Sequence, residues 1–158
     1  MRVSGLLACR MVVTGGLLCV AGTGGCASVQ WVHAPFAEVR RQALARRQPI
    51  FVYVMDTWSE DRTRMELEVF SNPQVIAALR DTVNKPAKYD WIDIDPELAK
   101  AVTVRAPQVC LVLDPSGREV DRLIANPIPT PARFVGWLND AKARATPPPP
   151  SRPAGTGP

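Results

Sequence analysis

Cysteine is scarce in the body of this chain. The sequence has four cysteines in 158 residues, and three of them (Cys9, Cys19 and Cys26) fall within the first 26 residues. Only Cys110 remains in the rest of the sequence. A single thiol cannot close an intramolecular disulfide, so a disulfide framework is excluded for the folded part.

Histidine is scarcer still, because His33 is the only one in the sequence. Zinc and iron sites draw mainly on His and Cys ligands, so we expect no metal site of that kind. Residues 90–97 contain four acidic side chains. These acids are interleaved with bulky apolar residues, which favours a strand and a helix cap over a calcium loop. A nucleophilic Ser59 would need a base close by, and His33 precedes the first expected helix, so we interpret Ser59 as an N-cap.

The first 25 residues lack acidic side chains and long apolar runs. Arg2 and Arg10 precede an apolar stretch over residues 11–20, and small residues follow at 21–25. That order is typical of an export signal. A membrane span needs about 20 apolar residues, and this stretch is about half that length. We expect residues 1–25 to be an export signal.

The end of this segment, Gly25-Cys26-Ala27-Ser28, resembles a bacterial lipoprotein signal. In such signals, cleavage just before the cysteine leaves it lipidated. Thr23 departs from the pattern, because Leu is usual there. The resemblance implies a lipid on Cys26 and a protein anchored in the bacterial cell envelope, facing the periplasm. A plain cleaved signal that ends near Ala27 and an uncleaved anchor are the alternatives.

Neither sign of charge dominates the remainder. Without Arg2 and Arg10, 17 of the 19 basic side chains remain, against 15 acidic ones. Nucleic-acid-binding domains concentrate basic charge on one face, so we expect no nucleic-acid partner. The four arginines within residues 40–47 are interpreted as a solvated helix face, ahead of a phosphate or lipid-headgroup site. Residues 146–158 contain six prolines and two glycines, and we expect a disordered tail.

Hydrophobic periodicity divides the middle of the chain into helices and strands. Helical spacing, N-caps and first-turn prolines predict helices over residues 36–47, 60–70, 73–80 and 96–102, and a last one that opens at Thr130. Apolar runs predict strands over residues 50–55, 89–94, 108–113 and 118–124, the last at an edge, with a turn over 114–117 and a polar connection over 81–88.

The order of these elements predicts the fold class. Strands separated by helices favour parallel pairing, and the closing hairpin adds an antiparallel edge. We therefore predict a single α/β domain over residues 36–145, with a mixed sheet flanked by helices. Residues 26–35 are interpreted as a linker.

Three stretches resemble the thioredoxin superfamily, in particular its periplasmic and lipoprotein branches. The first runs from Trp58 to Pro73 and contains Trp58-Ser59-Glu60-Asp61-Arg62 and a Val-Phe-Ser-Asn-Pro sequence. Relatives have Trp-Cys-x-x-Cys at its start. The second is Ile-Asp-Ile-Asp over residues 92–95, followed by a short helix and Ala106-Pro107, and the third is the hairpin through Gly117. The resemblance implies a thioredoxin-like fold and a Pro107 that follows a cis peptide bond against the redox motif.

Ser59 and Arg62 stand where those relatives have the two cysteines. Dithiol exchange needs an attacking thiolate and a second thiol that resolves the mixed disulfide. A hydroxyl forms no disulfide, and a guanidinium stays protonated. Tyr53 occupies the position of a buried acid that assists proton transfer in some relatives. Thiol oxidoreductase activity at Ser59 and Arg62 is therefore excluded, and we regard both as degenerate redox positions.

The remaining interpretation is a binding protein without a cofactor. In thioredoxin folds, the backbone beside the cis-proline pairs with extended substrate peptides. The resemblance thus implies a groove formed by Trp58, Ala106, Pro107 and Gln108, with a peptide or protein partner in the cell envelope. One alternative is a conditional thiol redox partner that acts through Cys110. Another is a tethered structural scaffold.

Overall fold

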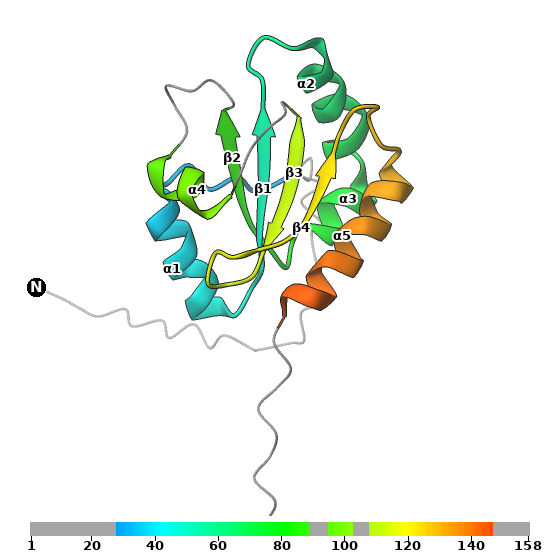
Figure 1. Ribbon diagram of the computed structural model, residues 1–158. Helices are drawn as coiled ribbons and strands as arrows, with labels where there is room; N and C mark the ends of the chain where they lie inside the picture. Colours follow the sequence, from blue (N-terminus) through cyan, green and yellow to red (C-terminus); the bar gives the residue numbers. More distant parts are fainter. Residues whose placement is uncertain (1–27, 89–94, 103–107, 147–158) are drawn as a thin grey trace, which may run out of the picture.

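The computed structural model describes residues 28–88, 95–102 and 108–146 (Figure 1). The expected strand over residues 89–94 and the predicted groove residues Ala106 and Pro107 lie outside these ranges. The elements in chain order are α1 (Phe36–Arg46), β1 (Ile50–Met55), α2 (Glu60–Arg64), the π-helix η1 (Met65–Phe70), α3 (Pro73–Ala78), β2 (Val83–Lys88), α4 (Pro96–Ala101), β3 (Val109–Leu113), β4 (Glu119–Ile124) and α5 (Pro131–Ala145).

The strands form a mixed sheet in the order β2-β1-β3-β4 (Figure 1). Strand β1 pairs in parallel with β2 and antiparallel with β3, and β3 pairs antiparallel with β4. The mixed sheet and the edge position of β4 are as predicted. The first strand of the closing hairpin, β3, lies inside the sheet, next to β1.

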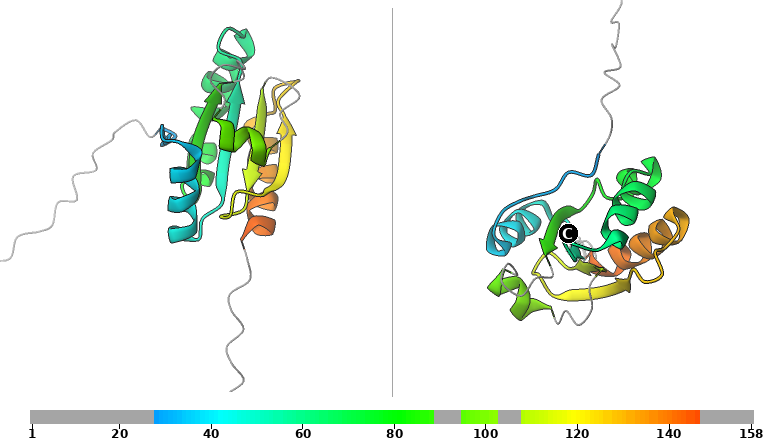
Figure 2. Two further views of the ribbon diagram at one scale, coloured as in Figure 1. Left: turned by 60° about the vertical axis from the view of Figure 1, so that its left-hand side comes forward. Right: turned by 90° about the horizontal axis from the view of Figure 1, so that it is seen from above.

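Helices cover both faces of the sheet, as Figure 2 shows. The apolar run of β1 contributes side chains to both faces of the sheet, because successive side chains of a strand point in opposite directions. Phe51 and Tyr53 join one core with η1, α3 and α5, whereas Ile50, Val52 and Val54 join a second core with α1 and α4. An unbroken apolar strand is therefore buried between two layers of helices, as predicted.

Strand β2 corrects the prediction for residues 81–88, which were expected to form a polar connection. Pairing runs from Ile50 opposite Val83 to Met55 opposite Lys88. The pattern hid this strand because Asn84, Lys85 and Pro86 are residue types that sheets disfavour. Pro86 is tolerated because β2 lies at the end of the sheet order, where one side of the strand is not paired along its length.

The polar residues of β2 are buried with hydrogen-bond partners, and these hydrogen bonds offset the cost of removing the polar groups from water. The Asn84 side chain donates to the carbonyl of Leu79 at 3.1 Å and accepts from the Thr82 hydroxyl at 2.6 Å. The Lys85 ammonium donates to the Ala34 carbonyl at 2.6 Å. Burial lowers the pKa of Lys85, and the nearby Asp95 carboxylate opposes that shift.

Residues 60–70 form two consecutive helical segments, an α-helix and a π-helix, in place of the single helix that was expected. The five residues of α2 run directly into η1. A π-helix has wider turns, so residues four and five apart share a face. Met65, Val69 and Phe70 all enter the core in this way. The N-cap inferred at Ser59 is confirmed, because its side chain accepts from a backbone N–H. Asn72, Asp95 and Thr130 cap the helices predicted to follow them in the same way.

The described part of the predicted linker packs against the domain. Trp31 forms an isolated parallel bridge with Asn84, and the Val32 N–H donates to the Asn84 carbonyl at 2.7 Å. The Trp31 ring lies against Phe51 and Phe70, with centroid distances of 6.2 and 5.5 Å. We call residues 28–34 the N-terminal strap, because they run along the β2 edge of the sheet. Among the helices of the described ranges, none has the length and apolar character to cross a membrane.

Candidate functional site

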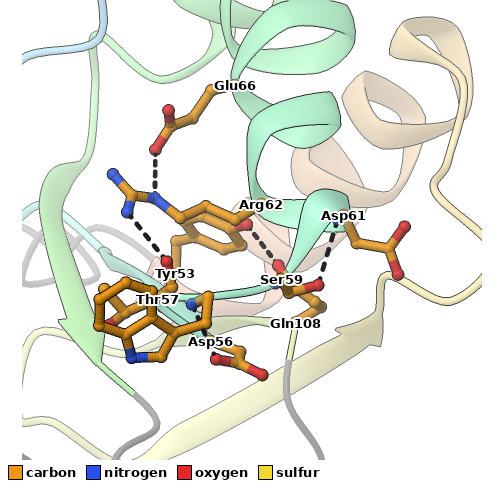
Figure 3. A network of polar contacts seen from close by, with 9 residues as sticks. Tyr53, Asp56, Thr57, Ser59, Asp61, Arg62, Glu66 and Gln108 are labelled. Carbon is orange, nitrogen blue, oxygen red and sulfur yellow. Dashed lines mark hydrogen bonds and ion pairs between the residues drawn. The ribbon is translucent and has the colours of Figure 1, made fainter.

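The candidate site lies where the chain leaves β1 and enters α2. Three backbone N–H groups there have nearby acceptors: Trp58 donates to an Asp56 carboxylate oxygen at 3.0 Å, Asp61 to the Ser59 hydroxyl at 3.1 Å and Arg62 to the Ser59 carbonyl at 3.1 Å. Figure 3 shows this network around the first turn of α2. Ser59 is therefore an N-cap, as predicted, and its hydroxyl is engaged in starting the helix.

Arg62, the second degenerate redox position, is held by two contacts. Its Nε lies 2.9 Å from a Glu66 carboxylate oxygen, one helical turn away. Its Nη1 donates to the Thr57 carbonyl at 3.4 Å (Figure 3). The guanidinium thus lies across the segment that joins β1 to α2. A fixed cation fills this position, and it has no nucleophilic or redox chemistry of its own.

Trp58 precedes this turn and points into solvent. Its side chain is 89% exposed, the highest value among the large exposed apolar residues of the described ranges. Nothing in the polar network of the turn requires a tryptophan there, because Trp58 contributes a backbone N–H. A large, rigid aromatic in this position is suited to contact with another molecule, since tryptophan is enriched in the centres of binding interfaces.

Beneath the turn, Tyr53 and Gln108 form a buried polar pair. The Tyr53 hydroxyl, on β1, donates at 2.5 Å to the Oε1 of Gln108, the residue before β3 (Figure 3). Burial, with smaller contributions from the neighbouring Cys110 and Glu66, raises the pKa of Tyr53 well above its ordinary value. Tyr53 therefore stays protonated and acts as a donor. It does not replace the buried acid that assists proton transfer in some thioredoxins.

Gln108 combines three unusual features. It is only 3% exposed, its backbone φ is 59°, and its Nε2 has no hydrogen-bond partner among the described residues. A non-glycine residue in the left-handed region is uncommon and is found disproportionately at functional sites. Gln108 was predicted as a groove residue, and in the structure its side chain accepts the hydrogen bond from Tyr53 below α2. Ala106 and Pro107, its predicted companions, stay predictions.

Cys110 lies inside the sheet, opposite Tyr53. The residue is fully buried, and burial raises the pKa of its thiol. Thiol exchange requires an accessible thiolate, so Cys110 is placed for packing and not for reaction. This observation weighs against the alternative of a redox partner that acts through Cys110.

A cavity of about 350 Å³ adjoins the site on the side of the N-terminal strap. Its walls come from the strap, β1, α2, η1 and β2, and they are Trp31, His33, Met55, Thr57, Arg62, Glu66 and Pro86. Sequence reasoning missed this cavity, because residues 26–35 were read as a linker. A tryptophan within a supposed linker was the available signal. The described residues contain no group of three or more His, Cys, Asp or Glu side chains placed to hold a metal ion.

The sheet topology, the helices on both faces and the turn between β1 and α2 define a thioredoxin-superfamily fold. Solved structures support this assignment. The DsbH oxidoreductase aligns with a TM-score of 0.62 at 16% identity, over 82% of this chain and 95% of its own. A thioredoxin from Thermus thermophilus aligns with a TM-score of 0.57 at 25% identity, over 72% and 86% of the two chains. The reduced C-terminal domain of Neisseria meningitidis DsbD aligns with a TM-score of 0.56 at 15% identity, over 67% and 92%.

These likenesses establish the fold and leave the activity open. No family model matches the chain, and a search of curated proteins found no match. DsbH is described as an oxidoreductase. In the described residues of the present chain the only thiol is that of Cys110, inside the sheet.

Proposed function

We propose that this protein is a non-catalytic, thioredoxin-like protein of the cell envelope, held at a membrane by a lipid on Cys26, that binds an extended peptide or protein segment. The observation that carries the proposal is the exposed Trp58 beside a helix start without a thiol. The ring is available to a ligand, while Ser59 and Arg62 are engaged in local contacts.

The cavity and the ion pair next to Trp58 support the binding of a peptide segment as the function of this site. The adjoining cavity offers an apolar wall from Trp31 and Met55, and an ion pair between Arg62 and Glu66 lies beside it. A segment that lies over Trp58 thus meets both apolar and charged groups. Backbone pairing beside Pro107, as in thioredoxins that hold a peptide, completes the proposed mode of recognition.

The absence of dithiol chemistry is tested by insulin reduction in the presence of dithiothreitol. We expect the purified protein to leave the rate at the background set by dithiothreitol, because Ser59 and Arg62 cannot exchange disulfides. An active thioredoxin serves as the positive control. Turnover above background contradicts the proposal, and a Cys110→Ala variant then shows whether the buried thiol of Cys110 carries it.

The binding site is tested with a random peptide library selected on the immobilised protein. Peptides selected on the parent protein are expected to bind Trp58→Ala about tenfold more weakly, because an aromatic anchor typically contributes more than 1.4 kcal/mol. Leu44→Ala is the matched control, since Leu44 is also exposed and lies on α1, away from the site. Equal binding to parent and Trp58→Ala, or a library that yields no binder, contradicts the proposed site.

A further inference from the structure

A second cavity, of about 460 Å³, lies beyond the β2 edge of the sheet. We propose that this cavity binds the phosphate group of an anionic lipid headgroup and thereby holds the β2 edge of the domain against the membrane. The inference rests on the proposed lipid anchor at Cys26, and it adds a second, charge-dependent contact to it. We call the cavity the arginine pocket, because Arg46 and Arg80 are the two charged residues among those that line it.

The two arginines come from different helices. Arg46 ends α1, and Arg80 follows α3, so one pocket is lined by cations that are 34 residues apart in the sequence. Neither has a carboxylate partner within the described residues, although most other arginines there do, including Arg62 and Arg122. The nearest acid in sequence, Asp81, does not line the pocket, and its carboxylate lies 3.9 Å from the ammonium of Lys142.

Neutral polar residues and apolar residues complete the lining, and the apolar ones are Val29, Val32, Ile76, Leu79 and Val83. Ser28, Gln30 and Gln48 contribute polar side chains. Among the described residues, these side chains make one long contact, from Gln30 Nε2 to the Ser28 carbonyl at 3.4 Å. A phosphate group accepts several hydrogen bonds at once, and guanidinium groups match its geometry in bidentate pairs. The two guanidinium groups, without carboxylate partners among the described residues and with neutral donors nearby, therefore suit a phosphate group and disfavour a cationic ligand.

The position of the pocket identifies the source of the phosphate. Ser28 lines the pocket, and Cys26 precedes it by two residues. A chain spans at most about 3.6 Å per residue, so a lipid attached at Cys26 is separated from the lining of the pocket by only two residues of backbone. The N-terminal strap runs along the β2 side between α1 and the helices of the opposite face (Figure 2, right). A lipid on Cys26 thus brings the arginine pocket to the bilayer surface, where headgroup phosphates are the abundant anions.

The test is an arginine footprint on the exported protein, purified in detergent and reconstituted into vesicles. Phenylglyoxal modifies accessible guanidinium groups, and mass spectrometry gives a rate for each arginine. In vesicles that contain phosphatidylglycerol, we expect Arg46 and Arg80 to react about fivefold more slowly than in detergent. An anionic surface attracts each nearby guanidinium group, and a bound guanidinium is less available to phenylglyoxal. Arg133 is the internal control, because it is exposed, lies at the start of α5 and is expected to keep its rate.

Each other result overturns the inference. Unchanged rates at Arg46 and Arg80 in phosphatidylglycerol vesicles exclude headgroup binding. Equal slowing in vesicles of phosphatidylcholine alone indicates shielding without charge recognition. Slowing by inorganic phosphate in detergent, without slowing by vesicles, identifies free phosphate as the ligand.

A variant pair adds a second readout. Arg80→Gln is expected to remove most of the slowing at Arg46, whereas Arg133→Gln leaves it unchanged, and circular dichroism verifies that both variants fold. Full slowing at Arg46 in Arg80→Gln contradicts a shared pocket. The mass of the Cys26 peptide in the same digest reports the anchor separately. Failure of the anchor or of peptide binding is therefore distinguishable from failure of the pocket.

Discussion

At the scale of single residues, the candidate site is defined by what its side chains are already bonded to. Ser59 caps α2, Arg62 pairs with Glu66, and Tyr53 donates to Gln108. Each of these groups is engaged in holding the turn between β1 and α2. Trp58 is the exception, since its ring points into solvent. Binding through Trp58 is therefore compatible with a rigid turn beneath it.

The buried thiol of Cys110 leads to the first prediction. In the native protein, we expect iodoacetamide to modify Cys110 at least about 100-fold more slowly than in urea, because the thiol is fully buried and its raised pKa disfavours the thiolate. Mass spectrometry of the Cys110 peptide measures the rate. A Ser59→Cys variant is the control, because position 59 is partly exposed whereas Cys110 is fully buried. Rapid native modification of Cys110 would revive its role as a redox partner.

At the scale of elements, Asp95 joins two helices that are distant in the sequence. Its carboxylate caps α4 by accepting from the Glu97 N–H at 3.0 Å, and it also accepts from the Phe36 N–H at the start of α1. Burial acts to raise the pKa of Asp95, but these backbone donors and the Lys85 charge outweigh it and lower that pKa. One ionised side chain thus satisfies the first turns of two helices.

This carboxylate makes part of the folding stability dependent on pH. Because the pKa of Asp95 is lower in the folded state, its contribution is present above its unfolded pKa and is lost as pH falls through the folded pKa. As the pH falls below 5, we expect the free energy of unfolding of Asp95→Asn to decrease by about 1 kcal/mol less than that of the parent protein. At pH 7, we expect Asp95→Ala to lower the free energy of unfolding by about 1 kcal/mol. Urea unfolding at several pH values measures both. A pH slope in Asp95→Asn equal to that of the parent protein would contradict this role.

Element-scale patterns were predictable where the signal is local. The apolar run of β1, the caps at Ser59, Asn72 and Thr130, and the final hairpin all follow from neighbouring residues. Strand β2 was not predictable in this way. Its polar side chains are accepted only because Asn84 and Lys85 find partners in the loop after α3 and in the N-terminal strap.

At the scale of the whole molecule, the N-terminal strap connects the anchor region to the core. Trp31 packs on the aromatic cluster of Phe51, Tyr53 and Phe70, and the strap lines both the cavity beside α2 and the arginine pocket. Membrane attachment and peptide binding would therefore involve neighbouring surfaces, separated by the β2 edge.

Trp31 and Trp58 form a matched pair for testing this arrangement. Trp31→Ala is expected to lower the free energy of unfolding by about 2–3 kcal/mol, because it removes a partly buried ring from the core. Trp58→Ala is expected to change it by less than about 0.5 kcal/mol, because the ring is exposed. Urea unfolding followed by circular dichroism measures both. Equal effects would mean that the N-terminal strap does not stabilise the domain.

The sequence by itself determined the fold class and the absence of a dithiol pair. Apolar periodicity and capping are local, and the side chains at positions 59 and 62 decide the possible chemistry wherever they lie. Only the tertiary structure decided which surfaces adjoin. Cavities form between segments distant in the chain, such as the N-terminal strap with η1, or α1 with the end of α3. The pairing of Tyr53 with Gln108 and the presence of Arg46 and Arg80 in the lining of one pocket follow from strand order and helix packing, which local sequence patterns do not predict.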